Sequence, residues 1–206
     1  MRINETCYFL AFSLYINFSF PLDAVTFTDV TNETGLVFKH QDGRSGRFYF
    51  LEELGSGAAF FDYDNDNDLD IYLVNSADLP GHNSVQTPVN RLYENDGRGT
   101  FTDVTQITNL GHTGYGVGCA VGDYDNDGDT DLYLTNFGPD VLYQNQGDGT
   151  FLNVTVSANT NNASWGTSCA FADFENDGFL DLYICLLYTS DAADEGLGVD
   201  LGGRRI

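Results

Sequence analysis

A nine-residue acidic segment occurs three times in this chain, and this repeat limits the folds that the chain can adopt. The copies span residues 62–70 (DYDNDNDLD), 123–131 (DYDNDGDTD) and 173–181 (DFENDGFLD). A glycine stands seven residues before each copy, and an Ile-Tyr or Leu-Tyr pair follows each copy. Because self-similarity at a fixed spacing marks an architecture of stacked units, the repeat has to be explained first.

The rest of the unit repeats as well. Residues 92–101 (LYENDGRGTF) match residues 142–151 (LYQNQGDGTF). Each unit holds four short runs rich in Val, Leu, Tyr, Phe and Thr, separated by turn-forming residues. No helical period is visible over residues 25–184, so we expect no helix there. Four strands in about 50 residues are typical of a β-propeller blade.

The predicted fold is therefore all-β, a partial β-propeller of about three blades. A parallel β-helix is the weaker alternative, because its coils would be much shorter. Since propellers contain four to eight blades, residues 25–184 would form an open arc with exposed blade edges.

The charge of the chain is lopsided and clustered. Asp and Glu number 31 against 8 Lys and Arg, which gives a net charge of −23. Such a surface repels phosphate backbones and anionic lipids, so the sequence argues against nucleic-acid and membrane-surface partners. The three acidic segments hold 14 of the 31 acids. Crowding like charges in this way is costly unless a cation compensates them.

Short loops of carboxylates with a sharp turn at position 6 are what Ca²⁺ prefers. Gly128 and Gly178 occupy that position, and Asn67 replaces glycine in the first copy. The predicted ligands are carboxylates at positions 1, 3, 5 and 9 and a backbone carbonyl at position 7. They are Asp62, Asp64, Asp66, Asp68 and Asp70; Asp123, Asp125, Asp127, Asp129 and Asp131; and Asp173, Glu175, Asp177, Phe179 and Asp181.

The loops differ from an EF-hand, because position 12 is Leu or Ile instead of a bidentate Glu. Mg²⁺, Mn²⁺ or metal-free acidic turns remain alternatives to Ca²⁺. We expect loop 123–131 to bind best. Loop 62–70 follows because of the strain at Asn67, and loop 173–181 is weakest because Glu175 is longer than Asp.

Residues 116–129 (GVGCAVGDYDNDGD) resemble the FG-GAP or VCBS repeat of integrin-α-like propellers. Residues 27–31 (FTDVT) and 52–57 (EELGSG) resemble secreted cartilage-acidic-protein and UnbV-type relatives. The resemblance implies a ring that is commonly seven-bladed, with calcium in the blade loops. Some members of the family also carry a C-terminal ASPIC/UnbV module, which we do not expect within these 206 residues.

The leading functional interpretation is a secreted calcium-binding scaffold for extracellular interaction or adhesion, with a protein or a glycan as its partner. Two alternatives stay open: a blade of a secreted propeller enzyme such as a polysaccharide lyase, or a carbohydrate-binding lectin. The sequence shows no nucleophile–base pairing, phosphate loop or dinucleotide motif. We therefore expect no enzyme activity and no catalytic residues.

The two ends of the chain are expected to lie outside the propeller. Residues 1–24 are expected to form a signal peptide, since Arg2 precedes an apolar stretch that ends near Ala24. This places the protein in the secreted or extracellular space, or in the periplasm or on the cell surface of a bacterium. Residues 185–206 are expected to be translated sequencing adapter, because the repeat stops at Ile184. No apolar run is long enough for a membrane span.

Several other residues carry weaker expectations. Cys119 and Cys169 share one repeat position, so they form either a blade-to-blade disulfide or two buried thiols. Tyr115 and Trp165 are expected to pack between blades. The three histidines share no spacing that indicates a zinc site, and we expect them in loops or on the surface.

Overall fold

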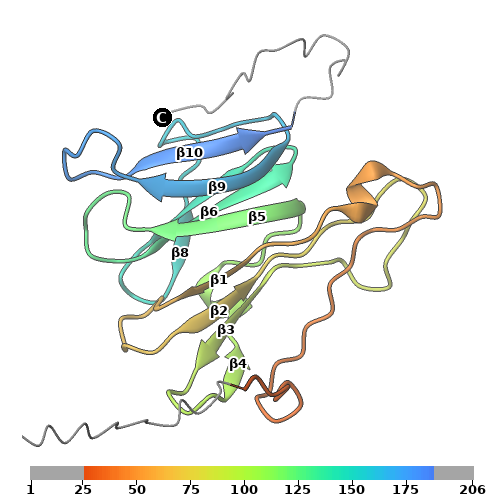
Figure 1. Ribbon diagram of the computed structural model, residues 1–206, viewed down its shortest axis with the longest axis horizontal. Helices are drawn as coiled ribbons and strands as arrows, with labels where there is room; N and C mark the ends of the chain where they lie inside the picture. The colour runs from red at the N-terminus through yellow and green to blue at the C-terminus, as the bar shows by residue number, and fades with distance from the viewer. Residues whose placement is uncertain (1–25, 188–206) are drawn as a thin grey trace, which may run out of the picture.

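The computed structural model describes residues 26–187 of the 206-residue chain and contains three antiparallel sheets (Figure 1). The first sheet holds β1 (Ala58–Phe61), β2 (Asp70–Leu73), β3 (Arg91–Asn95) and β4 (Phe101–Asp103). The second holds β5 (Tyr115–Gly122), β6 (Asp131–Phe137), β7 (Val141–Asn145) and β8 (Phe151–Asn153). The third pairs β9 (Gly166–Ala172) with β10 (Asp181–Leu186).

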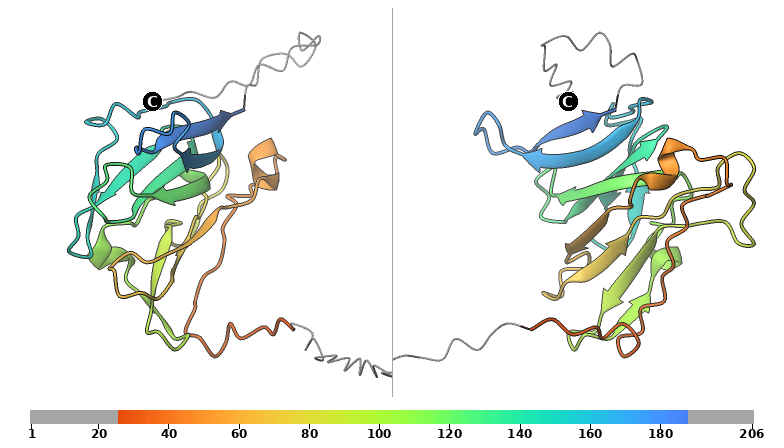
Figure 2. Two further views of the ribbon diagram at one scale, coloured as in Figure 1. Left: turned by 60° about the vertical axis from the view of Figure 1, so that its left-hand side comes forward. Right: turned by 45° about the vertical axis from the view of Figure 1, so that its right-hand side comes forward.

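Each sheet is a meander in which strands that follow one another in the chain are hydrogen-bonded neighbours. The sheets are stacked in chain order from β1–β4 through β5–β8 to β9–β10 (Figures 1 and 2). This is the arrangement of β-propeller blades, so the predicted partial propeller is confirmed: two four-stranded blades and two strands of a third. We call them blades 1, 2 and 3.

Period-2 alternation gives each blade two apolar faces, and each blade packs one face on its neighbour. Tyr72 and Leu92 are paired across β2 and β3 and are fully buried against Leu132 and Leu134 of blade 2. On the opposite face of blade 2, Tyr133, Leu142 and Val154 pack against Leu182 and Ile184 of blade 3. Burying such side chains contributes about 1.5–3 kcal/mol each, so these interfaces hold the blades together.

One tyrosine position measures how far this stacking extends. Tyr72 and Tyr133 are 0 % exposed, whereas the equivalent Tyr183 on β10 is 37 % exposed. In the described part of the chain, no further sheet covers the face of blade 3 that carries Tyr183. Within residues 26–187 the arc is therefore open at this face, which agrees with the predicted partial propeller.

Glycine allows the innermost strands to approach closely. A Cβ atom on Gly57 would lie 2.9 Å from the Cα of Gly118 on β5, closer than real Cβ contacts. A Cβ atom on Gly118 would in turn lie 3.0 Å from the carbonyl oxygen of Thr167 on β9. The inner edges of the three blades therefore touch through backbone atoms.

A buried polar group ties β2 to β3 at the end of blade 1 opposite the acidic hairpin. Asn90 is fully buried, and its Oδ1 atom accepts the backbone N–H of Asn75 at 2.7 Å. The Nδ2 group of Asn90 donates to the Tyr72 hydroxyl at 3.0 Å. All these polar groups have partners, which removes most of the cost of burying them.

Blade 2 uses a carboxylate at the same position. Asp140 is 1 % exposed, and its Oδ1 atom accepts the backbone N–H of Asn136 at 2.8 Å. Its Oδ2 atom accepts the Tyr133 hydroxyl at 3.2 Å and the Asn162 amide at 2.9 Å. Burial raises the pKa of Asp140 to about 6.

The expectation that residues 25–184 contain no helix was wrong at two places. A 3-10 turn, η1, spans Phe50–Glu53, and a one-turn helix, α1, spans Thr105–Thr108. The left-handed Asn109 (φ 64°) ends α1 after four residues. A helix this short has no apolar period, so a search for periodicity does not detect it.

Tyr115 and Trp165 pack as expected between elements. They lie in one apolar cluster with Leu51, Leu79 and Val117. The ring centres of Trp165 and Phe137 are 4.9 Å apart in an edge-to-face arrangement. This cluster fixes the connection between blades 2 and 3 to the segment that precedes blade 1.

Of the two alternatives for the cysteine pair, the structure shows free thiols. Cys119 packs in the core between blades 1 and 2, and Cys169 packs in the core between blades 2 and 3. Burial raises the pKa of Cys119 to about 12, so the thiol is protonated at neutral pH.

Strand β10 runs to Leu186, two residues past the expected end of the repeat. Main-chain pairing does not depend on the side chain, so a strand can continue where the repeat pattern stops. The expected signal peptide and residues 188–206 of the expected adapter tail lie outside the described residues.

We predict that Asp140→Asn changes how stability depends on pH. The folded state holds a proton on Asp140 up to about pH 6, whereas the unfolded state releases it near 3.8. The Asp140 contribution to stability is therefore present below pH 4 and lost as the pH rises to 6. Relative to the parent, the variant should gain up to about 1.4 kcal/mol per pH unit across this window.

Urea unfolding between pH 4 and pH 7 measures this difference. The reverse exchange in blade 1, Asn90→Asp, is the matched control and should show the opposite slope. Parallel stability curves for the parent and Asp140→Asn would contradict the prediction. A constant difference in the free energy of unfolding between the two proteins reflects the altered hydrogen bond to Asn162. Only the difference in how that free energy changes with pH tests the prediction.

Candidate metal centre

The three acidic segments form the hairpins between β1 and β2, between β5 and β6, and between β9 and β10. All three project from one side of the stacked sheets, at the left of Figure 1. The β-hairpin geometry explains this placement, because each segment connects the first two strands of its blade. We call them loops 1, 2 and 3 and number their positions from 1 to 9.

The aspartate at position 1 closes each loop. Its two carboxylate oxygens accept the backbone N–H groups of positions 5 and 6, at donor–acceptor distances of 2.8–3.1 Å. Because the carboxylate has further lone pairs, these bonds leave it able to bind a cation as well. The residues are Asp62, Asp123 and Asp173.

The aspartate at position 5 makes a shorter-range cap. One oxygen of its carboxylate accepts the backbone N–H of position 7 at 2.9–3.0 Å. This is the bond of an Asx turn, which Asp and Asn form with the residue two positions later. The residues are Asp66, Asp127 and Asp177, and they therefore stabilise the turn without any metal.

The aspartate at position 9 connects the loop to the third strand. Asp131 is fully buried, and its two oxygens accept the N–H of Tyr124 at 3.0 Å and the N–H of Asn145 at 2.8 Å. Asp70 bonds Tyr63 and Asn95 in the same way. This carboxylate thus holds position 2 of the loop and the end of β3 or β7 together.

Two positions in each loop adopt the left-handed conformation. Position 6 does so at Asn67, Gly128 and Gly178, as expected for the sharp turn. Position 4 does so as well, at Asn65, Asn126 and Asn176, with φ between 56° and 63°. Position 4 was not among the positions expected to be left-handed. The same residue type in all three copies is nevertheless a signal for it, since Asn is the non-glycine side chain that best tolerates this conformation.

The carboxylates at positions 1, 3 and 9 converge in two of the loops. In loop 1 they belong to Asp62, Asp64 and Asp70, and in loop 2 to Asp123, Asp125 and Asp131. Within each group the ligand atoms lie within 4.8 Å of one another. Two oxygens that share a Ca²⁺ ion at about 2.4 Å are separated by no more than about this distance, so each group has the dimensions of a calcium site.

The electrostatics of loop 2 also fit a cation. The Oδ2 atom of Asp125 accepts the Gln144 amide at 2.6 Å, whereas its buried Oδ1 atom has no hydrogen-bond partner. Burial raises the pKa of Asp131 to about 7, and the charges of Asp125 and Asp127 act in the same direction. A divalent ion would satisfy the buried oxygen and compensate the charges, so the residues present fit the metal.

Loop 1 resembles loop 2 but is more open. Asp64 is exposed, while Asp70 is buried and its pKa is raised by burial to about 6. Burial and the neighbouring Asp66 raise the pKa of Asp64.

In loop 3, Asp173, Glu175 and Asp181 do not form a third group of this kind among the described residues. The longer side chain of Glu175 is the difference from the other two loops at position 3. Asp173 and Asp181 keep their hydrogen-bonding roles in closing the loop. The ranking of loop 3 as the weakest calcium site stays a prediction.

The remaining predicted ligands lie outside the two groups. The carboxylates of Asp66, Asp127 and Asp177 cap position 7. Position 7 holds Asp68, Asp129 and Phe179, and Phe179 is 58 % exposed. The predicted ligand at position 7 is the backbone carbonyl, so the exposure of the side chain does not bear on it. The role of this carbonyl stays a prediction.

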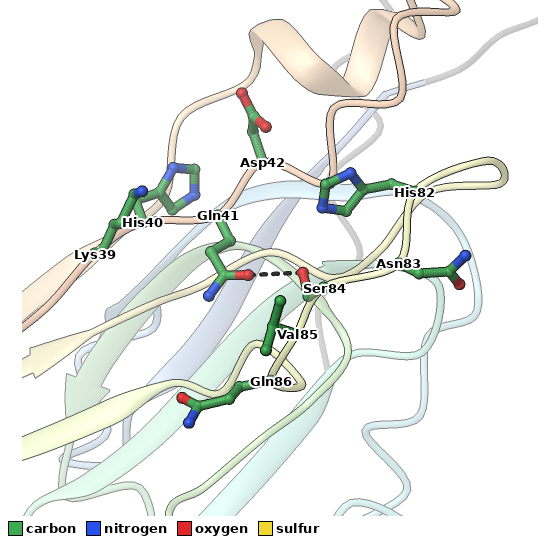
Figure 3. Close-up of a pocket in the computed structure, with 10 residues that line it drawn as sticks. Lys39, His40, Gln41, Asp42, His82, Asn83, Ser84, Val85 and Gln86 are labelled. Atoms are coloured by element: carbon green, nitrogen blue, oxygen red, sulfur yellow. Dashed lines mark hydrogen bonds between the residues drawn. The ribbon is translucent and has the colours of Figure 1, made fainter.

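A cavity of about 480 Å³ lies in blade 1 between residues 39–43 and residues 82–86 (Figure 3). Its walls are mixed, with more apolar than polar surface, and the Ser84 hydroxyl donates to Gln41 across it at 2.7 Å. His40 and His82 stand in these two loops, as expected. Their neighbours are the Ser76 hydroxyl at 3.3 Å and the Asp78 carboxylate at 3.8 Å, respectively.

The family model described as FG-GAP-like repeat matches residues 62–134 and residues 123–184, together more than half of the chain. Each match begins at position 1 of an acidic loop. No curated protein sequence matches the chain at the level required for a relative. No helix in residues 26–187 is long and apolar enough to cross a membrane.

We predict that two aspartates of loop 2 differ in what their removal does. Asp131→Ala leaves the N–H groups of Tyr124 and Asn145 without their acceptor, which should lower the free energy of unfolding by about 2–5 kcal/mol with or without calcium. Asp125→Asn removes charge and leaves the backbone bonds intact. In chelator it should therefore be neutral or slightly stabilising, because it relieves repulsion among the loop carboxylates, and it should reduce only the stabilisation that calcium adds.

Thermal unfolding of both variants in chelator and in calcium measures the difference. A calcium-independent loss in Asp125→Asn, or a loss confined to calcium in Asp131→Ala, would show that the two roles are assigned wrongly.

Proposed function

The chain belongs to the FG-GAP-like repeat family, and we propose that it is a secreted calcium-binding β-propeller protein that acts as an extracellular interaction or adhesion scaffold. FG-GAP-like repeats are typical of extracellular proteins. Residues 27–31 and 52–57 support a closer kinship with secreted cartilage-acidic-protein and UnbV-type proteins.

One observation carries the calcium part of the proposal. In loop 2, three carboxylates have oxygens within 4.8 Å of one another, and a buried oxygen of Asp125 lacks a partner. Loop 1 repeats the group with Asp62, Asp64 and Asp70. Repetition at equivalent positions of a repeat unit supports a common ligand over an accidental gathering of surface acids.

The residues suggest how such an ion would act. Ca²⁺ would compensate part of the negative charge of the five carboxylates that loops 1 and 2 each hold in nine residues. Asp123 orients the loop through two backbone bonds, Asp131 fixes its exit to β7, and Asp125 offers the free oxygen. The metal would therefore act structurally, by holding the hairpins rigid at one end of the blades.

Rigid hairpins on one side of a stack of sheets suit a binding surface. Loops that are held by a scaffold are the usual place for recognition residues. The net charge of −23 favours partners with positive or neutral surfaces. A secreted protein also meets the calcium concentrations that loops of moderate affinity need.

We predict that calcium stabilises the protein selectively. At about 100 times the dissociation constant, each occupied loop should add about 2.7 kcal/mol to the free energy of unfolding. Mg²⁺ at the same concentration should add less, because it demands octahedral geometry and gives up water reluctantly. Calorimetric unfolding in chelator, Ca²⁺ and Mg²⁺ measures this, and equal curves in all three would refute calcium binding.

We predict that residues 1–24 direct export. In cultured animal cells the full chain with a C-terminal tag should reach the medium, and a variant that lacks residues 2–24 should stay in the cells. Surfaces coated with the secreted protein should then retain cells in calcium and release them in chelator. A full chain that stays in the cells speaks against secretion, and equal retention in calcium and chelator speaks against a calcium-dependent adhesion scaffold.

A further inference from the structure

The asparagine at position 4 of loops 1 and 2 reaches the next loop of the stack. The Nδ2 group of Asn65 in loop 1 donates to the Oδ1 atom of Asp129 in loop 2, at 2.6 Å. The Nδ2 group of Asn126 in loop 2 donates to the carbonyl oxygen of Gly178 in loop 3, at 2.9 Å. Equivalent residues thus make the same kind of contact twice, from each loop to the following one.

The acceptors belong to the part of the loop where the cation would bind. Asp129 occupies position 7, whose carbonyl is the predicted backbone ligand, and Gly178 precedes that position in loop 3. The N–H groups of Asp129 and Phe179 are held by the position-5 carboxylates. A contact here bears directly on whether the ligand carbonyl is in place.

A second bridge joins loops 1 and 2. The Nδ2 group of Asn145 on β7 donates to the carbonyl oxygen of Tyr63 at 2.8 Å and to that of Thr130 at 3.3 Å. The backbone N–H of Asn145 donates to Asp131. One residue therefore contacts position 2 of loop 1 and positions 8 and 9 of loop 2.

Given the proposed calcium binding, on which this step rests, we propose that neighbouring loops bind calcium cooperatively through the position-4 asparagines. An ion in one loop fixes its left-handed position 4, and the asparagine there holds the next loop in its binding conformation. The next ion then orders fewer groups and binds more tightly. By linkage, the effect runs equally in both directions.

A single neutral hydrogen bond sets the size of the effect. Its net value of about 0.5–1.5 kcal/mol corresponds to a change of about two- to twelvefold in the calcium dissociation constant of the neighbouring loop. Charge alone predicts the opposite sign, because a filled loop is less negative than an empty one and attracts the next ion less. The direction of the effect therefore identifies its cause.

The test uses the full chain and follows calcium binding to loop 3 by the NMR signal of the Gly178 amide. This amide donates to Asp173 inside the loop, so it reports on loop 3 itself. Asp125→Asn empties loop 2. Asn126→Gly removes the bridge and keeps a residue that accepts positive φ. Asn176→Gly is the matched control, because it makes the same change at the same loop position and leaves the bridge intact.

We expect Asp125→Asn to weaken calcium binding at Gly178 about two- to twelvefold in the parent and in the Asn176→Gly background. In the Asn126→Gly background the weakening should disappear, and binding should be unchanged or slightly tighter, because only the charge effect remains. Equal weakening in all three backgrounds, no weakening in any, or tighter binding in the parent would overturn the coupling. If the Gly128 amide responds to calcium and the Gly178 amide does not, calcium binding stands and the coupling falls. If neither responds up to about 10 mM calcium, the proposed function fails with it.

Discussion

The buried carboxylate at the end of loops 1 and 2 is the contact on which the rest of each complete blade depends. Asp131 accepts backbone N–H groups from the loop and from β7, and Asp70 does the same for β3. Without it the hairpin could pivot about the first two strands, and the third strand would lose its register at the loop end. The cost of this arrangement is a buried negative charge, which explains why burial raises the pKa of both groups. A cation beside the same carboxylates would offset this buried charge while the backbone contacts stay in place.

The aspartates of one loop therefore have different structural roles, although they are the same residue type in the sequence. Position 1 folds the loop on itself, position 5 caps the turn, and position 9 ties the loop to the sheet. Position 3 is the exception in loop 2, because one oxygen of Asp125 has no protein partner. A carboxylate can accept backbone hydrogen bonds and bind a metal at the same time, so the structural roles of Asp123 and Asp131 are compatible with the proposed ligand roles.

Much of the fold was predictable because each repeat unit in the sequence corresponds to one blade of the structure. The spacing of the acidic segments and the alternating apolar runs indicated blades, and the glycine at position 6 indicated the turn. The roles of Asn65 and Asn126 were not predictable from the pattern, because their bonds join segments that are 64 and 52 residues apart in the chain. The helix α1 was missed since a single turn has no period. The grouping of positions 1, 3 and 9 needed coordinates, because spacing alone does not say which carboxylates converge.

The glycines at the inner strands have a consequence for the geometry of a complete ring. Gly57 and Gly118 bring the inner edges of neighbouring blades to backbone contact, whereas tyrosine and leucine side chains keep the sheets apart farther out. Each blade is thus a wedge, and the difference in thickness between its two ends sets the angular step to the next blade. A larger side chain at Gly118 would thicken the inner end and reduce that step, so that closing the circle would take more blades. The number of blades in such a ring therefore depends partly on the absence of side chains at these inner glycines.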